Sequence, residues 1–185
     1  SLGLKADGSI VAWGCGDPVN YGQCAVPAPN ADFIGIAAGG LHSLGLKADG
    51  AMVAWGYNGY GQTNVPAPNS GFIAVAAGGK HSLGLKADGS IVGWGNNDHG
   101  LGDLPSPNVD FIAVAAGAYH SLGVTTGGYI RAWGCGDSLY DNFNFGQCYI
   151  YGTGVVAVGG GSYHSLGRKA GGSIVASECI RFFYD

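Results

Sequence analysis

The sequence is poor in charge, in arginine and in long apolar runs. Only 11% of its 185 residues are charged, and the formal net charge is −4. A nucleic-acid-binding protein normally carries a basic patch, whereas this chain holds only three arginines, Arg131, Arg168 and Arg181. No stretch approaches the roughly 18 consecutive apolar residues of a membrane-spanning helix. These absences argue against nucleic acid as a partner and against insertion into a membrane.

Glycine, in contrast, is abundant. It supplies 37 of the 185 residues, a fifth of the chain against a typical share of about 7%. Glycine in a helix interior costs about 1 kcal/mol relative to alanine, which argues against a helical protein. The hydrophobic share of 46% is too high for a disordered segment. The composition therefore predicts a turn-rich, all-β protein.

An internal repeat runs through the chain. The tetrapeptide His-Ser-Leu-Gly occurs four times, at spacings of 39, 39 and 44 residues, and tryptophan recurs in step with it. The tetrapeptides begin at His42, His81, His120 and His164, and the tryptophans are Trp13, Trp55, Trp94 and Trp133. Regular repeats of this length are typical of propellers and solenoids.

The fullest repeat, residues 72–107, predicts four short antiparallel strands. The first strand covers residues 72–78, the second 81–86 and the third 90–94. The fourth strand of a repeat ends at its prolines, as at Pro66 in the preceding repeat. An Asp-Gly or Gly-Gly pair between the second and third strands predicts a two-residue type I′ turn. Four strands in about 40 residues is the pattern of a β-propeller blade. Hairpin turns of this kind disfavour the alternative, a β-solenoid.

The repeats predict an incomplete ring. The chain opens in a second strand and closes just after a third, so it holds four first, five second, five third and four fourth strands, 18 in all. We expect one domain, residues 1–185, forming about four and a half blades, with residues 177–185 as an off-pattern tail. We interpret the chain as a fragment of a larger propeller or as an arc that another chain completes, and the unpaired edges of such an arc favour self-association.

The motifs AAGGKHSLGLKADGSIVGWG and WGYNGYGQ resemble the regulator-of-chromosome-condensation repeat family. The Pro-Ala-Pro-Asn linkers at residues 27–30 and 66–69 are similar to those of its bacterial branch, which includes β-lactamase inhibitor protein II. The resemblance covers nearly the whole chain and implies a propeller, usually of seven blades in this family. Nothing in the chain matches the long insertion that the eukaryotic founding member uses for nucleotide exchange.

The repeated histidines and tryptophans are predicted to be structural. A catalytic residue is needed once, whereas a structural one recurs in every blade. We expect the histidines to bond to the backbone at the start of the second strand, and the tryptophans to lie in the core. Histidine and the serine after it point to opposite faces of a strand, so we predict that the pair does not act as base and nucleophile. Histidines in separate blades are expected to lie too far apart to share a metal.

Two pairs of cysteines flank the enlarged loops of two repeats. Cys15 and Cys24 enclose one loop, and Cys135 and Cys148 enclose the corresponding loop of another repeat. Because the longer loops and the cysteine pairs occur together, we predict a disulfide within each pair, and structural disulfides imply an oxidising compartment. A zinc site is the alternative, but the spacing is longer than is common in zinc sites. Cys179, in the tail, receives no assignment.

No cofactor or metal is predicted. Four oxygen-bearing side chains lie in one loop, but their spacing is not that of a calcium loop. They are Asp137, Asp141, Asn142 and Asn144. We interpret this segment as an ordinary polar loop.

Strand alternation places the loops after the first and third strands on one face. These loops vary between repeats and are rich in aromatic residues, which are enriched in interfaces. The predicted binding face consists of Tyr21, Leu41, Tyr57, Tyr60, Lys80, His99, Tyr119, Tyr140, Phe143, Phe145 and Tyr163. The competing interpretation is that loops vary because little constrains them.

The sequence therefore favours a non-catalytic module, extracellular or on a cell surface, that binds another protein through this face. Two alternatives are a guanine-nucleotide exchange or chromatin-associated propeller and a lyase or hydrolase with an axial site. An axial enzyme would need polar residues near the axis, where the first strands offer only Ala, Gly, Val and Ile.

Overall fold

The computed structural model describes residues 1–16, 20–98, 100–135 and 147–177. Within these residues fourteen strands form five antiparallel sheets. The strands are β1 (Leu2–Leu4), β2 (Ile10–Ala12), β3 (Phe33–Ala38), β4 (His42–Lys47), β5 (Met52–Gly56), β6 (Phe72–Ala77), β7 (His81–Lys86), β8 (Ile91–Gly95), β9 (Phe111–Ala116), β10 (Ser121–Thr125), β11 (Ile130–Trp133), β12 (Val155–Gly160), β13 (Ser165–Lys169) and β14 (Ile174–Ala176). No helix in this part of the chain is long and apolar enough to cross a membrane.

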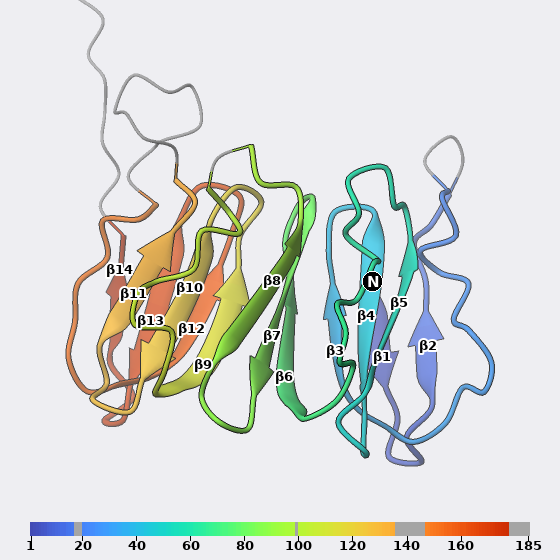
Figure 1. Cartoon of the computed structure of the whole chain (residues 1–185), viewed down its shortest axis with the longest axis horizontal. Coiled ribbons are helices and arrows are strands. Elements are labelled where there is room, and N and C mark those ends of the chain that lie inside the picture. The colour runs from blue at the N-terminus through green and yellow to red at the C-terminus, as the bar shows by residue number, and fades with distance from the viewer. Residues whose placement is uncertain (17–19, 99, 136–146, 178–185) are drawn as a thin grey trace, which may run out of the picture.

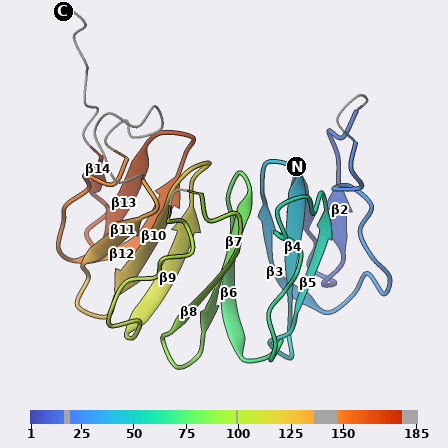
Figure 2. The ribbon, with the colours of Figure 1, turned by 45° about the horizontal axis from the view of Figure 1, so that its top comes forward.

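The five sheets are the blades of a partial propeller. Blade 1 contains β1 and β2, and blades 2 to 5 contain β3–β5, β6–β8, β9–β11 and β12–β14. Figure 1 shows the blades side by side in chain order, and the arrangement is also visible in the rotated view of Figure 2. The first strands of blades 2 to 5 contact one another, so they are the innermost strands. The predicted all-β propeller arc is confirmed.

The predicted fourth strand is wrong for the residues that the structure describes. In blade 2, residues 61–65 form successive turns, in which Asn64 N donates to Gly61 O at 3.0 Å and Val65 N donates to Thr63 O at 3.0 Å. These turns use the amides that a ladder would need, and Pro66 has no amide to donate. Val65 still packs against the cluster of Leu46, Met52 and Phe72.

The hairpin turn also differs from the predicted type I′ turn. Gly50 N donates to Lys47 O at 3.0 Å, and Lys47 N donates to Ala51 O at 2.8 Å. Gly50 alone is left-handed, with φ of 80°, so the loop has three residues and ends in a glycine bulge. The Asp49 carboxylate accepts the Ala51 amide at 2.9 Å. Aspartate is selected here as a local acceptor, and only the glycine needs a positive φ.

The apolar core lies between the blades. Leu83, Leu85 and Ile91 of blade 3 form one buried cluster with Phe111 and Trp133 of blade 4. Alternate residues of the second strand face the following blade, as the period of a β-strand requires. Each blade is therefore stabilised mainly by its neighbours.

Candidate functional site

Three of the repeated histidines join adjacent blades. The Nε2 atom of each lies within hydrogen-bond distance of a serine hydroxyl in the blade that follows. The pairs are His42–Ser82 at 2.9 Å, His81–Ser121 at 3.0 Å and His120–Ser165 at 2.8 Å. These three histidines are therefore structural, as predicted. The prediction that they bond to the backbone is wrong, because Nε2 bonds to a serine side chain of the next repeat.

The hydroxyl of Ser82 lies between His42 and Gln62, and its second bond fixes which atom donates in the bond to the histidine. Ser82 Oγ donates its only proton to Gln62 O at 2.9 Å, so it accepts a proton from His42 Nε2. Nδ1 of His42 is then unprotonated, and it is buried without a partner. Burial lowers the pKa of His42 to about 4, and the ring stays neutral. A ring that already donates to the hydroxyl cannot deprotonate it, so the pair is no catalytic dyad.

The carbonyl of Gln62 also accepts a hydrogen bond from an indole. Trp94 Nε1 donates to Gln62 O at 2.9 Å, beside the bond from Ser82. The same pair of bonds joins the loop of blade 1 to blade 2, since Gln23 O accepts from Ser43 at 3.0 Å and from Trp55 at 2.9 Å. One loop carbonyl therefore fixes two side chains of the next blade.

Trp13 departs from the expected core position. Its side chain is 54% exposed, whereas Trp55 and Trp133 are buried. Trp13 belongs to blade 1, and the described residues place no loop carbonyl before it.

Both predicted disulfides are present. Cys15 is bonded to Cys24 and Cys135 to Cys148, each with a Cα–Cα distance of 6.0 Å. Cys24 directly follows Gln23, whose carbonyl is the acceptor just described. The bridges thus anchor the loops beside the carbonyls that join the blades.

The loops without cysteine are closed by an asparagine, which the sequence analysis missed. Asn58 Nδ2 donates to Asn64 Oδ1 at 2.9 Å, and Thr63 N donates to Asn58 Oδ1 at 3.0 Å. In blade 3, Gly102 N donates to Asn97 Oδ1 at 2.6 Å. The available signal was that Asn58 and Asn97 stand at the same place in the two plain loops.

Tyrosines of the predicted binding face contact one another across blades. The rings of Tyr21 and Tyr57 lie 4.8 Å apart, and Tyr57 meets Tyr60 edge-on at 6.0 Å. Tyr119 and Tyr163 are stacked at 5.5 Å. Tyr57 N donates to Leu41 O at 2.9 Å, which brings the loops after the first and third strands together. Tyr21, Tyr60 and Tyr163 are exposed, and Leu41, Tyr57 and Tyr119 are half-buried.

Lys80 lies against this aromatic surface. Its Nζ is 4.5 Å from the centre of the Tyr60 ring, and a hydrogen bond with Tyr60 raises the pKa of Lys80. The lysine therefore stays charged. Partial desolvation, together with the neighbouring Tyr119, raises the pKa of Tyr163, which stays protonated as a hydroxyl donor.

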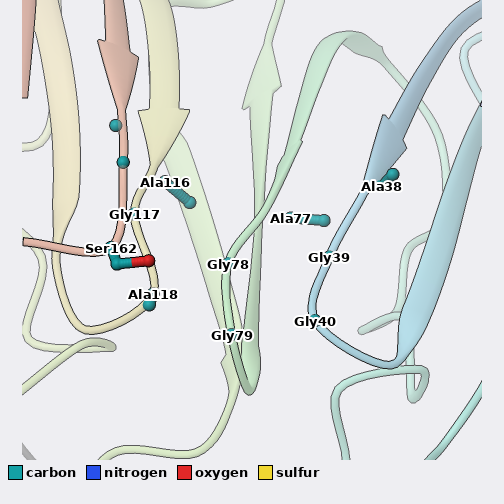
Figure 3. Close-up of a pocket in the computed structure, with 12 residues that line it drawn as sticks. Ala38, Gly39, Gly40, Ala77, Gly78, Gly79, Ala116, Gly117, Ala118 and Ser162 are labelled. Carbon is teal, nitrogen blue, oxygen red and sulfur yellow. The ribbon is translucent and has the colours of Figure 1, made fainter. Parts of the chain in front are cut away.

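A shallow hollow of about 310 Å³ lies beside these loops, at the ends of the innermost strands. Figure 3 shows its wall crossing four adjacent blades. The lining consists of Ala38, Gly39, Gly40, Ala77, Gly78, Gly79, Ala116, Gly117, Ala118, Gly160, Gly161 and Ser162. Side chains here are small because the blades approach closely: a Cβ on Gly78 would lie 2.6 Å from Gly117 O.

The hollow offers little chemistry. Ser162 supplies the one side-chain hydroxyl of its lining. Across the described residues, no group of three or more His, Cys, Asp or Glu side chains could hold a metal.

Some predicted residues lie outside the described residues. Four of them belong to the predicted binding face: His99, Tyr140, Phe143 and Phe145. The others are the polar loop residues Asp137, Asp141, Asn142 and Asn144, and Cys179 of the tail. These predictions stay predictions.

Comparison with known families gives a specific match. A family model described as "Regulator of chromosome condensation (RCC1) repeat" matches residues 33–62, 72–101 and 111–139. The three matched segments begin at β3, β6 and β9 and so fall in blades 2 to 4. No curated protein matches the chain.

The chain is also similar to solved propellers. Prp20p from Saccharomyces cerevisiae is 21% identical, with a TM-score of 0.69, over 97% of this chain and 54% of that chain. The ectodomain of the receptor kinase CR4 from Physcomitrella patens is 23% identical, with a TM-score of 0.68, over 91% of this chain and 46% of that chain. A structure of yeast Prp20 bound to Kap60 matches at 20% identity and a TM-score of 0.66, over 97% of this chain and 52% of that chain. The chain thus spans about half the length of these structures.

Proposed function

Since blades 2 to 4 match the RCC1 repeat, we propose that the chain is a non-catalytic module that binds another protein through its aromatic loop face. The observation that carries the proposal is the series of ring contacts from Tyr21 to Tyr57 and Tyr60, with Lys80 over Tyr60. Tyrosine brings a large contact area with a hydroxyl, and it is enriched among residues that dominate binding energy.

The geometry of the loop face supports binding rather than mere loop variation. Variable loops without a role have no reason to stack their rings, yet Tyr119 and Tyr163 are stacked. Ring contacts between loops hold these side chains in place before a partner arrives, which lowers the entropy lost on binding. A propeller with the same fold, Prp20, has been crystallised with the protein Kap60.

Two observations support a non-catalytic role. The axial hollow is lined by alanine, glycine and a single serine, and a general acid or base needs a titratable group. The buried serines donate to carbonyls, as Ser82 does to Gln62. The net charge of −4 and the three arginines disfavour the chromatin-associated alternative.

We also propose an extracellular location. Structural disulfides persist in oxidising compartments, and the chain contains two. The similar CR4 structure is an ectodomain. The Pro-Ala-Pro-Asn linkers lead us to assign the chain to the bacterial branch of the family.

The test compares tyrosines on opposite faces. Tyr57→Ala and Tyr119→Ala remove central members of the aromatic surface. The control variant, Tyr129→Ala, removes an exposed tyrosine that follows the hairpin turn of blade 4. The wild-type chain and the three variants are immobilised, and partners from an extracellular extract of the source are captured and quantified. Each loop-face substitution should weaken binding by about 2 kcal/mol or more.

The control decides the outcome. Tyr129→Ala should bind as the wild type does, and circular dichroism should show that all three variants are folded. A partner that is lost with Tyr129→Ala and retained with Tyr57→Ala and Tyr119→Ala would place binding on the opposite face and contradict the proposal.

A further inference from the structure

Lys80 breaks the repeat in the loop that follows the first strand. The other three repeats carry Leu41, Tyr119 or Tyr163 before the histidine, so a charge stands at this place in blade 3 alone. The other lysines recur at or beside the ends of the second strands, next to the hairpin turns. They are Lys5, Lys47, Lys86 and Lys169. A residue that supports the fold recurs from blade to blade, whereas a residue of a binding site is needed once.

The recurring lysines already have partners within the fold. Lys47 Nζ lies 3.9 Å from the centre of the Phe33 ring and donates to two backbone carbonyls of the preceding linker. Lys86 Nζ lies 4.9 Å from the centre of the Phe72 ring. Lys80, in contrast, is exposed on the loop face. Its charge is therefore available to a ligand.

Lys80 lies between the two groups of tyrosines on the loop face. On one side its Nζ is 4.5 Å from the centre of the Tyr60 ring, which also contacts Tyr57. On the other side Tyr119, which is stacked on Tyr163, lies near enough to act electrostatically on Lys80. A partner that covers the tyrosines of blades 2 to 5 therefore covers the ammonium group as well.

The ammonium group of Lys80 has donors to spare. It carries three N–H groups, and one of them bonds to Tyr60. The described residues show no ion pair with Lys80: Asp98 acts on it electrostatically, but the Asp98 carboxylate accepts from Asn96 Nδ2 at 2.7 Å. Burying a charged lysine without an opposite charge is costly. A partner that covers this surface has to bring a negatively charged acceptor.

We propose that the partner of the loop face presents an Asp or Glu side chain to Lys80, flanked by apolar side chains that pack on Tyr60 and Tyr119. The inference rests on the proposed function, since it names the partner chemistry of the same surface. A carboxylate and an ammonium group form a charge-assisted hydrogen bond. The net charge of −4 repels acidic ligands in general, so a preference for a carboxylate has to come from a local cation.

Peptide selection on the full chain tests the proposal. A phage library of random short peptides is selected on the wild type, and the selected peptides are synthesised and titrated by fluorescence anisotropy. They should be enriched in Asp or Glu beside apolar residues. Lys80→Glu should weaken their binding at least about tenfold. Lys80→Arg keeps the charge and the contact with the Tyr60 ring, and should bind nearly as the wild type does.

A change in the peptide completes the cycle. Replacing the selected Asp or Glu by its amide should weaken binding to the wild type, but should have little effect on binding to Lys80→Glu, because both changes remove the same contact. Added salt should weaken the binding of the acidic peptides to the wild type.

Two further variants separate this inference from the proposed function. Tyr57→Ala should weaken binding of the peptides, and Tyr129→Ala, which removes an exposed tyrosine on the opposite face, should not. Peptides that need Tyr57 but carry no carboxylate, or that bind Lys80→Glu as tightly as the wild type, would overturn the inference and leave the proposed function standing. Peptides that bind regardless of Tyr57, or a selection that yields no binder, would contradict both.

Discussion

Two loops of the propeller place a backbone carbonyl in the same position, although different interactions close them. The loop of blade 1 is closed by the Cys15–Cys24 bond, and the loop of blade 2 is closed by Asn58. Both present a glutamine carbonyl to the next blade, and each carbonyl accepts one serine hydroxyl and one indole at 2.9 to 3.0 Å. The glutamine side chains match too, since Tyr21 N donates to Gln23 Oε1 and Tyr60 N donates to Gln62 Oε1.

The comparison shows what the fold requires of these loops. The fixed quantity is the position of the carbonyl, because two buried donors of the next blade depend on it. The means of closure is interchangeable: a covalent bond in an enlarged loop or an asparagine in a short one. The loops also differ in what can break them, since only the first is sensitive to reduction.

Lowering the pH should reduce the free energy of unfolding more than any of the substitutions below. This effect should not depend on how the two loops are closed. Burial lowers the pKa of His42, His81 and His120 to about 4, from the ordinary 6.5. The unfolded chain therefore binds more protons, and stability should fall as pH drops from about 6.5 toward 4, by up to about 1.4 kcal/mol per pH unit for each histidine. Denaturant unfolding across this range measures the loss.

A histidine variant provides the control for the acid effect. His81→Gln removes one of the three imidazoles and should reduce the pH dependence by about a third, although the variant is less stable at neutral pH. Unfolding free energies that do not change between pH 6.5 and 4 would contradict the buried, neutral state of these rings.

Removal of the covalent closure should have the next largest effect. The double variant Cys15→Ser, Cys24→Ser frees a loop with a sequence separation of 9 residues. The chain-entropy model gives a loss of about 2–3 kcal/mol for a loop of this size, measured by urea unfolding. A reducing agent should not destabilise this junction further. Unchanged stability in the double variant would mean that hydrogen bonds alone hold the carbonyl.

Serine substitutions should sharpen the contrast between the two junctions. Ser82→Ala removes the acceptor of His42 and one of the two donors to Gln62 O, and it should cost about 2 kcal/mol, mainly because the buried histidine loses its partner. Ser43→Ala removes only the bond to Gln23 that the structure shows, and should cost about 1 kcal/mol. Thermal unfolding of the two variants side by side gives the difference. Equal losses would argue against the role of the histidine bond.

The smallest effect is expected for the asparagine closure. Asn58→Ala removes two local hydrogen bonds at an exposed site, and should cost about 1 kcal/mol. Asn20→Ala, in the loop that the disulfide already closes, removes one bond to Gly22 and should cost less. Loss of stability that is larger for Asn20→Ala would reverse the comparison.

Much of the fold could be predicted from the repeat. Predicted strand 81–86 coincides with β7, and predicted strand 72–78 exceeds β6 by one residue. The cysteine pairs were predicted from loop length. The fourth strand was wrong, because the turn hydrogen bonds after Gly61 depend on side chains such as Asn58 rather than on apolar alternation.

The candidate site was only partly predictable. Alternation brought Tyr57 and Leu41 to one face, and their loops do meet. It did not reveal that Lys80 lies over Tyr60 or that Tyr119 stacks on Tyr163, since these contacts join loops of different blades. Whether this face binds a partner stays a prediction.

The sequence by itself predicted the first three strands of the repeat, the glycine of its hairpin turn and the two loops that disulfides bridge. These features arise from alternation, local hydrogen bonds and loop closure, which act within one repeat. Only the tertiary structure decided that His42 bonds Ser82, 40 residues later in the chain. The physical reason is that the rotation between adjacent blades brings residues of different repeats together, and no single repeat encodes that rotation.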